Sequence, residues 1–209
     1  MSGQFVIPGT NESIMLKHLR EKYGQEFVAT GMTGSSNFGG DPVLFCYPKG
    51  GDPETDKVRA TMSKLKNGER SFEDTYFGII IREDLESEVL AALPDLQLPM
   101  KAYFNCTSFY YDESFDSTKT YVDFKQWEID SGKSKLLDIT IAIPMDGTDK
   151  SKKEEYANRI FDILEQYGFR IYITVRFYPS EVFEIITRKN VFDLYKIYDE
   201  YALFSKIID

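Results

Sequence analysis

The stretch that decides the fold is residues 136–179, LLDITIAIPMDGTDKSKKEEYANRIFDILEQYGFRIYITVRFYP. Its two ends, LLDITIAIP at 136–144 and FRIYITVRFYP at 169–179, are rich in β-branched and aromatic residues, as strands are. The polar and charged residues between them have apolar side chains at helical spacing. The stretch therefore predicts a strand, a helix and a second strand.

Capping residues set the limits of the helix in this stretch. Asp149 or Ser151 can accept hydrogen bonds at its start, and Gly168 can end it. The spacing of apolar residues predicts a buried face that comprises Tyr156, Ile160, Ile163, Leu164 and Tyr167.

An earlier part of the chain predicts a second unit of the same kind. We expect a strand at YFGIII (76–81), a helix at REDLESEVLAAL (82–93) and a strand at PMKAYFNCTSFYY (99–111). The two units do not match residue by residue. A decayed duplication and a common α+β arrangement both explain the pattern.

The N-terminal part predicts a helix followed by short strands. Thr10 or Asn11 can cap the helix and Gly24 can end it. Turn-forming residues then separate four runs, which favours an antiparallel meander. The expected strands are residues 26–32, 42–47, 58–65 and 75–82.

These elements define an α+β fold: an antiparallel sheet with helices packed on one side and two strand–helix–strand units. Residues 190–209 predict a closing helix. A polar segment at 111–120 suggests halves at 1–115 and 116–209, although one single domain fits the sequence too.

Composition argues against several classes of partner. The 209 residues include 25 Lys and Arg against 34 Asp and Glu, for a formal charge of -9, and both expected halves are acidic. Nucleic acid and anionic membrane surfaces are therefore disfavoured, whereas a basic protein partner remains open. No apolar run is long enough for a transmembrane segment.

The glycine-rich stretch TGMTGSSNFGGD (30–41) does not predict a phosphate-binding loop. A Walker loop needs Lys and then Ser or Thr after its last glycine, but Asp41 and Pro42 follow here. Because apolar runs that suit strands flank the glycines, we expect a wide hairpin or bulge.

Few residues suit catalysis or metal binding. His18 is the single histidine, and Cys46 and Cys106 lie in apolar runs where thiols stay protonated. The sequence predicts no cofactor, no metal site and no catalytic residue. Cys46 and Cys106 could form a disulfide if their strands were neighbours.

The carboxylates at 73–88 are the basis of an alternative function, a hydrolase acting on glycans. Such an enzyme needs two carboxyl groups facing one cleft. Helix capping is the competing explanation, because the dipole at a helix start favours the negative charges of Glu83 and Asp84. The full group comprises Glu73, Asp74, Glu83, Asp84, Glu86 and Glu88.

The aromatic stretch AYFNCTSFYYDESFD (102–116) offers a candidate binding surface. Tyrosine and tryptophan near acids suit recognition of a protein or a sugar, although a core role for these rings competes with that interpretation. The candidate binding residues are Tyr110, Tyr111, Trp127, Asp112 and Glu113.

The segment LREKYGQEFVATG (19–31) resembles the start of uncharacterised secreted proteins and lipoproteins of Gram-positive bacteria. This resemblance implies an extracytoplasmic protein whose leader has been removed. It carries over no functional residue. The chain departs from the pattern because it starts without a leader and without a lipid-carrying cysteine.

The sequence thus favours a non-catalytic protein, either protein-binding or similar to an immunity protein or inhibitor, with a protein partner that could be basic. The alternatives are the glycan hydrolase and a structural module of a cell-surface assembly. For the compartment, an extracytoplasmic location is favoured over the cytoplasm.

Overall fold

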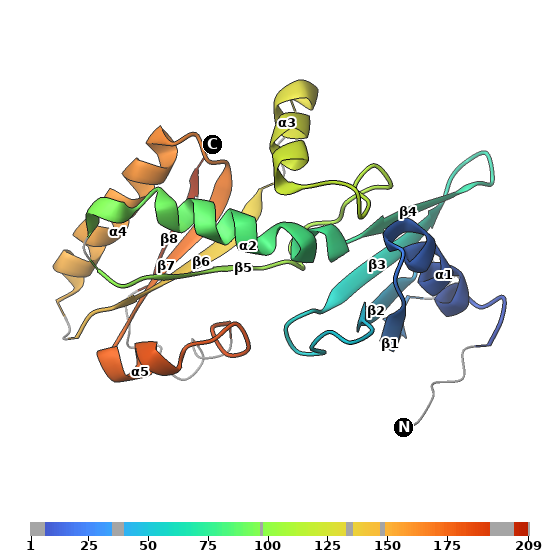
Figure 1. Ribbon diagram of the computed structural model, residues 1–209, viewed down its shortest axis with the longest axis horizontal. Helices are drawn as coiled ribbons and strands as arrows, with labels where there is room; N and C mark the ends of the chain where they lie inside the picture. The colour runs from blue at the N-terminus through green and yellow to red at the C-terminus, as the bar shows by residue number, and fades with distance from the viewer. Residues whose placement is uncertain are drawn as a thin grey trace. The chain divides into compact units, whose positions relative to one another are not determined.

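The computed structural model describes residues 7–34, 40–96, 98–132, 136–146, 149–192 and 203–208 (Figure 1). The chain forms two compact units. The first unit comprises Met1–Ile80 and Cys106–Thr120, and the second comprises Ile81–Asn105 and Tyr121–Asp209. The chain therefore leaves the first unit and later returns to it. The division at residue 115 stays a prediction.

The first unit contains one helix and a four-stranded antiparallel meander. Its elements are α1 (Asn11–Tyr23), β1 (Phe27–Thr33), β2 (Val43–Pro48), β3 (Val58–Lys64) and β4 (Arg70–Asp74). The strands lie in the sheet in the order of the chain, so the predicted antiparallel meander is confirmed for its first three strands, whereas its fourth strand is residues 70–74 and not the predicted 75–82. The predicted ends of α1 are also correct, because Thr10 accepts a hydrogen bond from the Ser13 amide and Gly24 has a φ of 68°.

The core of this unit lies between α1 and one face of the sheet. Met15, Leu19 and Tyr23 of α1 belong to the same buried cluster as Leu44 and Ala60 of the strands. Alternate residues of β2 and β3 are buried, because successive side chains of a strand point to opposite faces of the sheet. The glycine-rich stretch begins in β1, and its residues 35–39 lie outside the described residues.

The helix α2 (Tyr76–Ala91) corrects two predictions. The strands expected at 75–82 and 76–81 are wrong, because these residues and the following run form one continuous helix. Phe77, Ile81, Leu85 and Val89 are fully or almost fully buried and recur every four residues, which is helical spacing. A short apolar run such as YFGIII fits either a strand or a buried helix by pattern alone.

The second unit is built on a mixed sheet in the order β5 (Lys101–Phe104), β6 (Leu137–Pro144), β7 (Ile171–Tyr178) and β8 (Leu203–Ile208). β6 and β7 are parallel and joined by α4 (Lys150–Gln166), so the strand–helix–strand unit at 136–179 is confirmed. β5 and β8 are antiparallel to their neighbours. The other helices are η1 (Pro94–Leu96), α3 (Tyr121–Ser131) and α5 (Ser180–Ile185).

The helix α4 matches its predicted limits but not its entire predicted face. Asp149 accepts hydrogen bonds from the amides of Ser151 and Lys152, and Gly168 has a φ of 76° after the helix end. The buried residues are Lys153, Ala157, Ile160, Phe161 and Leu164. Tyr167, which was expected on the buried face, is 63% exposed.

The C-terminal prediction is wrong where the structure describes it, because residues 203–208 form β8 and not a helix. This strand pairs with β7, and Leu203 and Ile207 are exposed while Ile208 is buried. Residues 193–202 of the expected helix lie outside the described residues. The strand predicted at 99–111 is likewise shorter, and ends at Phe104.

The α+β class is confirmed, but the strands form two four-stranded sheets in place of the single sheet that the sequence predicts. One predicted strand–helix–strand unit is present, and the other is the helix α2 followed by β5. In the second unit, α5 packs on the sheet face that bears Ala142 and Tyr178. Figure 1 shows α4 and α5 on opposite sides of this sheet, which explains why β6 is buried on both faces.

Candidate functional site

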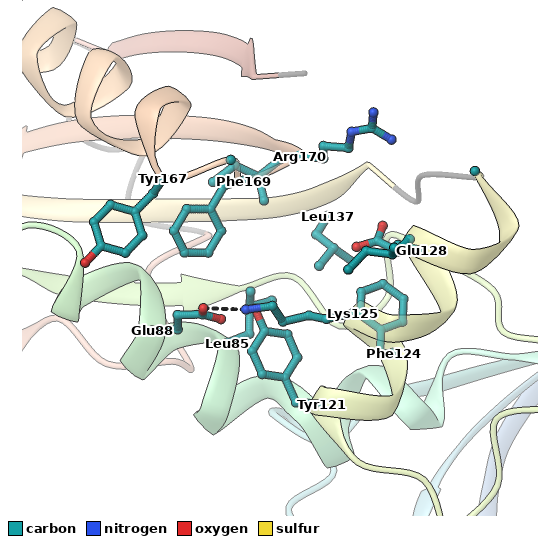
Figure 2. A pocket seen from close by; sticks show the side chains of 14 residues that line it. Leu85, Glu88, Tyr121, Phe124, Lys125, Glu128, Leu137, Tyr167, Phe169 and Arg170 are labelled. Carbon is teal, nitrogen blue, oxygen red and sulfur yellow. Dashed lines mark hydrogen bonds and ion pairs between the residues drawn. The ribbon is translucent and has the colours of Figure 1, made fainter.

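The second unit contains a pocket with a volume of about 420 Å³. Its walls come from α2, α3, the start of β6 and the turn between α4 and β7 (Figure 2). The volume is within the roughly 300–1,000 Å³ that is usual for small-molecule sites. A space of this size also suits one or two large side chains of a partner.

Eight of the fourteen residues that line the pocket are aromatic or aliphatic, although polar atoms contribute slightly more of its surface than apolar atoms do. Phe124 is 1% exposed, and Leu85 and Leu137 are buried too. The rings of Tyr167 and Phe169 lie next to each other, with centroids 6.2 Å apart and planes inclined by 22° (Figure 2). The pocket thus offers apolar contacts from elements that are far apart in the sequence.

A glycine determines the position of this aromatic pair. Gly168 adopts a φ of 76°, a left-handed conformation that ends α4. The chain turns there directly into β7, which places Tyr167 and Phe169 on either side of the turn. Tyr167 remains 63% exposed, whereas Phe169 is buried.

The polar part of the pocket is a cluster of three side chains. The Lys125 ammonium lies 2.6 Å from Oε1 of Glu88 and 5.6 Å from the centre of the Tyr121 ring. The Tyr121 hydroxyl donates to the Glu88 carboxylate. Burial raises the pKa of Tyr121, and the hydrogen bond and negative charge of Glu88 raise it further, so this hydroxyl stays protonated at neutral pH.

The pocket has a second carboxylate, Glu128. It comes from α3, in which Asp123, Glu128 and Asp130 outnumber the single cation Lys125. Arg170 also borders the pocket, but Figure 2 shows its guanidinium directed away from the other labelled side chains. The helix α3 is acidic as a whole, but its charged side chains that line the pocket are one cation, Lys125, and one carboxylate, Glu128.

Trp127 is the one predicted binding residue in the second unit. It lies on α3 and stacks on Phe124, with ring centroids 6.2 Å apart and planes inclined by 20°. Since Phe124 lines the pocket, Trp127 contacts a residue of the pocket wall. It is half-buried and does not line the pocket itself.

The other predicted binding residues belong to the first unit. Tyr111 offers no surface, since it is 0% exposed and packs against Phe77 and Phe115, so it is corrected to a core residue. Tyr110 is half-buried and lies 5.1 Å from the guanidinium of Arg59.

The two predicted acids of this group are exposed. Asp112 accepts hydrogen bonds from the amide and the hydroxyl of Ser114, which is a local turn interaction. Glu113 is exposed. The structure thus places four of the five predicted residues in one loop segment and Trp127 in the other unit.

The carboxylates of 73–88 have separate roles. Asp74 is buried and accepts from Lys22 and Tyr23, with both distances at 2.8 Å. Glu86 forms a two-pronged ion pair with Arg188, at 2.6 and 2.7 Å. Only Glu88 lies in the pocket with Glu128. Glu83 and Asp84 lie inside α2 and not at its start, so the capping interpretation of these two is wrong.

The remaining chemical candidates are structural residues. His18 stacks on Phe72, with ring centroids 4.0 Å apart. Cys46 and Cys106 are both buried and do not form a disulfide with each other. Within the described residues, no group of three or more His, Cys, Asp or Glu side chains could hold a metal ion. None of the helices in the described ranges is long and apolar enough to cross a membrane.

The comparisons with known proteins identify no family. No protein-family model matches the sequence. No curated protein matches it either. The chain is similar to a solved crystal structure of a DUF5037 family protein from Ruminococcus gnavus, with a TM-score of 0.49 and 16% identity over 94% of this chain and 90% of that chain. The resemblance of residues 19–31 to secreted proteins stays a prediction.

Sequence reasoning missed most of the pocket. The helix α3 was not predicted, although Tyr121, Phe124, Lys125 and Glu128 lie at positions i, i+3, i+4 and i+7, a spacing that places side chains on one helix face. That spacing was the available signal. The contribution of Tyr167 was missed because the helical pattern assigned this residue to the core.

Proposed function

We propose that this chain is a non-catalytic binding protein that holds a segment of another protein in the pocket of its second unit. The observation that carries the proposal is the pocket rim, where Ile129 and Tyr167 are 73% and 63% exposed. Exposed apolar side chains that gather around a pocket are typical of interaction sites. A protein that acts as an inhibitor or immunity factor would use such a surface.

The pocket supplies the parts that an anchoring side chain of a partner needs. Phe124 and Phe169 would contact an apolar or aromatic side chain within the pocket, and Tyr167 would cover it at the rim. Tyrosine is enriched among the few residues that supply most of the binding energy in protein interfaces. The charged side chains of Glu88, Lys125 and Glu128 would supply the polar part of this contact.

A displayed library of random peptides, selected on the immobilised chain, tests this proposal. We expect enriched peptides to share an aromatic or large aliphatic residue. Their binding should be lost in the variant Ile129→Asp, because a carboxylate at the rim disfavours an apolar contact.

The matched control is Val122→Asp, which changes an exposed apolar residue of the same helix that does not line the pocket. Val122 is 74% exposed, so both substitutions place a charge at a position of equal exposure. Peptides that bind both variants equally well, or a selection without enrichment, would contradict the proposal.

The second candidate is the carboxylate-dependent hydrolase acting on glycans. It is favoured by one observation, the presence of Glu88 and Glu128 in the same pocket. The interaction of Glu88 with Lys125 and Tyr121 makes binding the better proposal, because this carboxylate is already engaged. Release of fluorophore from a panel of fluorogenic glycosides, abolished by Glu128→Gln, would establish the hydrolase instead.

A further inference from the structure

The side chain of Lys125, a residue of the protein itself, lies in the pocket. The Lys125 ammonium lies between the Glu88 carboxylate, at 2.6 Å, and the Tyr121 ring, whose centre is 5.6 Å away. A carboxylate and an aromatic face together are a favourable environment for a cation. The pair is accessible, since the side chains of Lys125 and Glu88 are 48% and 31% exposed. Ion pairs of this exposure are weak, and water or a competing cation can replace one partner.

Two carboxylates, Glu88 and Glu128, and two cations, Lys125 and Arg170, line the pocket, and the Arg170 guanidinium is directed away from the other labelled side chains, so displacement of Lys125 leaves an excess of negative charge (Figure 2). Three carboxylates act on Tyr121, those of Glu88, Glu128 and Asp84. Asp84 is exposed, and Glu128 lines the pocket. Because the chain also carries a formal charge of -9, the long-range field attracts basic partners and repels acidic ones.

We propose that the partner presents a lysine next to its apolar anchor, and that the ammonium of this lysine replaces the Lys125 ammonium between Glu88 and Tyr121. This inference rests on the proposed function, and it adds the chemistry of the partner. Lys125 then acts as an internal competitor. A segment with an apolar anchor alone leaves Lys125 in place, whereas the lysine of a segment that also carries one exchanges with Lys125 on Glu88, so the interaction becomes a net gain only when Lys125 is removed.

Three capped peptides probe the proposal: acetyl-Phe-Lys-Phe-amide and its analogues with norleucine or glutamate in place of lysine. Binding is followed by the fluorescence of Trp127, which is the single tryptophan of the chain and stacks on Phe124 of the pocket wall. None of the peptides contains tryptophan. The signal therefore reports on the protein alone.

The decisive variant is Lys125→Met, which removes the internal ammonium and keeps a long side chain. We expect it to bind the lysine peptide at least about threefold more tightly than the unaltered protein does, because removing a competing state raises apparent affinity. Binding of the norleucine peptide should change less. Glu88→Gln should abolish the preference for lysine over norleucine.

The matched control is Lys152→Met, which causes the same change in net charge at an exposed position of α4 outside the pocket. Equal effects of Lys125→Met and Lys152→Met would overturn the inference, since they would reflect net charge only. Equal binding of the lysine and norleucine peptides to Lys125→Met would also overturn it and leave the proposed function intact. If no peptide changes the fluorescence of any variant, both proposals fail.

Discussion

The Lys22 ammonium lies 2.8 Å from Oδ2 of Asp74, and the two side chains are only 4% and 2% exposed. Asp74 also accepts from the Tyr23 hydroxyl and from the amide of Tyr76 at the start of α2. Lys22 donates in addition to the carbonyl of Asp112. This buried pair thus joins α1, the end of β4 and the returning segment of the first unit.

Replacing Lys22 by methionine should destabilise the first unit strongly. The substitution leaves a buried carboxylate without its cation, which costs ~3–5 kcal/mol in other proteins. Urea denaturation would measure the free energy of unfolding. The control is Lys17→Met on the same helix, whose 3.7 Å pair with Glu21 is 65% and 61% exposed. Because such exposed pairs contribute about 0.3–0.5 kcal/mol, equal losses in the two variants would contradict this account.

Mild acid should destabilise the protein through His18. Burial lowers the pKa of His18, so its folded form favours the neutral imidazole, although the nearby carboxylates of Glu113, Asp74 and Glu21 oppose this shift. The contribution of His18 to the free energy of unfolding is complete above its pKa in the unfolded state, about 6.5. It is lost as the pH falls through the lower pKa of the folded state.

The comparison variant for this titration is His18→Phe, which retains a ring to stack on Phe72. Because His18 is the only histidine, the variant should lose the decline in melting temperature that begins below pH ~6.5. Identical pH profiles of both proteins down to the range where carboxylates titrate would rule out this role.

The thiol of Cys46 should be almost inert in the folded protein. Burial raises its pKa to about 12, and the negative charge of Asp74 adds to the effect. Since the thiolate is the reactive form, a Cys106→Ala variant should react with a disulfide reagent at neutral pH only after denaturant is added. Rapid labelling in the native state would indicate that β2 opens locally.

Replacing Gly168 by alanine should affect both stability and the pocket. The position has a φ of 76° and open space where the added methyl group would lie, so the cost is conformational, about 1–2 kcal/mol. Gly24→Ala provides the control, because Gly24 has a φ of 68° and similar open space at the end of α1. Both variants should lose similar stability in thermal melts, but only Gly168→Ala should weaken peptide binding, since it shifts Tyr167 and Phe169.

The sequence predicted those parts of the fold that local signals determine. The limits of α1 and α4 depend on caps at Thr10 and Asp149 and on glycines that end the helices, and all of these signals lie within the helices or next to them. The first three strands of the meander followed from the turns between them for the same reason. The parallel pairing of β6 and β7 was not predicted, because an antiparallel sheet was expected, although the helix between the two strands was the available signal for it.

Elements that depend on distant partners were harder to predict. The apolar run 76–81 suits a strand or a helix by sequence alone. The buried residues Phe77 and Ile81 are four positions apart, which is the spacing of a helix. β8 exists because residues 203–208 pair with β7, about thirty positions earlier in the chain. The pocket forms where α2, α3, the start of β6 and the turn between α4 and β7 meet, which explains why only Trp127 among the predicted residues lies near it.

The interleaved course of the chain affects how the protein can be made and dissected. During synthesis, the first unit cannot be completed when Ile80 has emerged, because its segment Cys106–Thr120 follows 25 residues of the second unit. Among the contacts that must wait is the pairing of Tyr111 with Asp74. A single cut between residues 80 and 121 would leave one or both units incomplete. Obtaining either unit alone would require a rearranged chain order, whereas ordinary truncation would yield partly unfolded fragments.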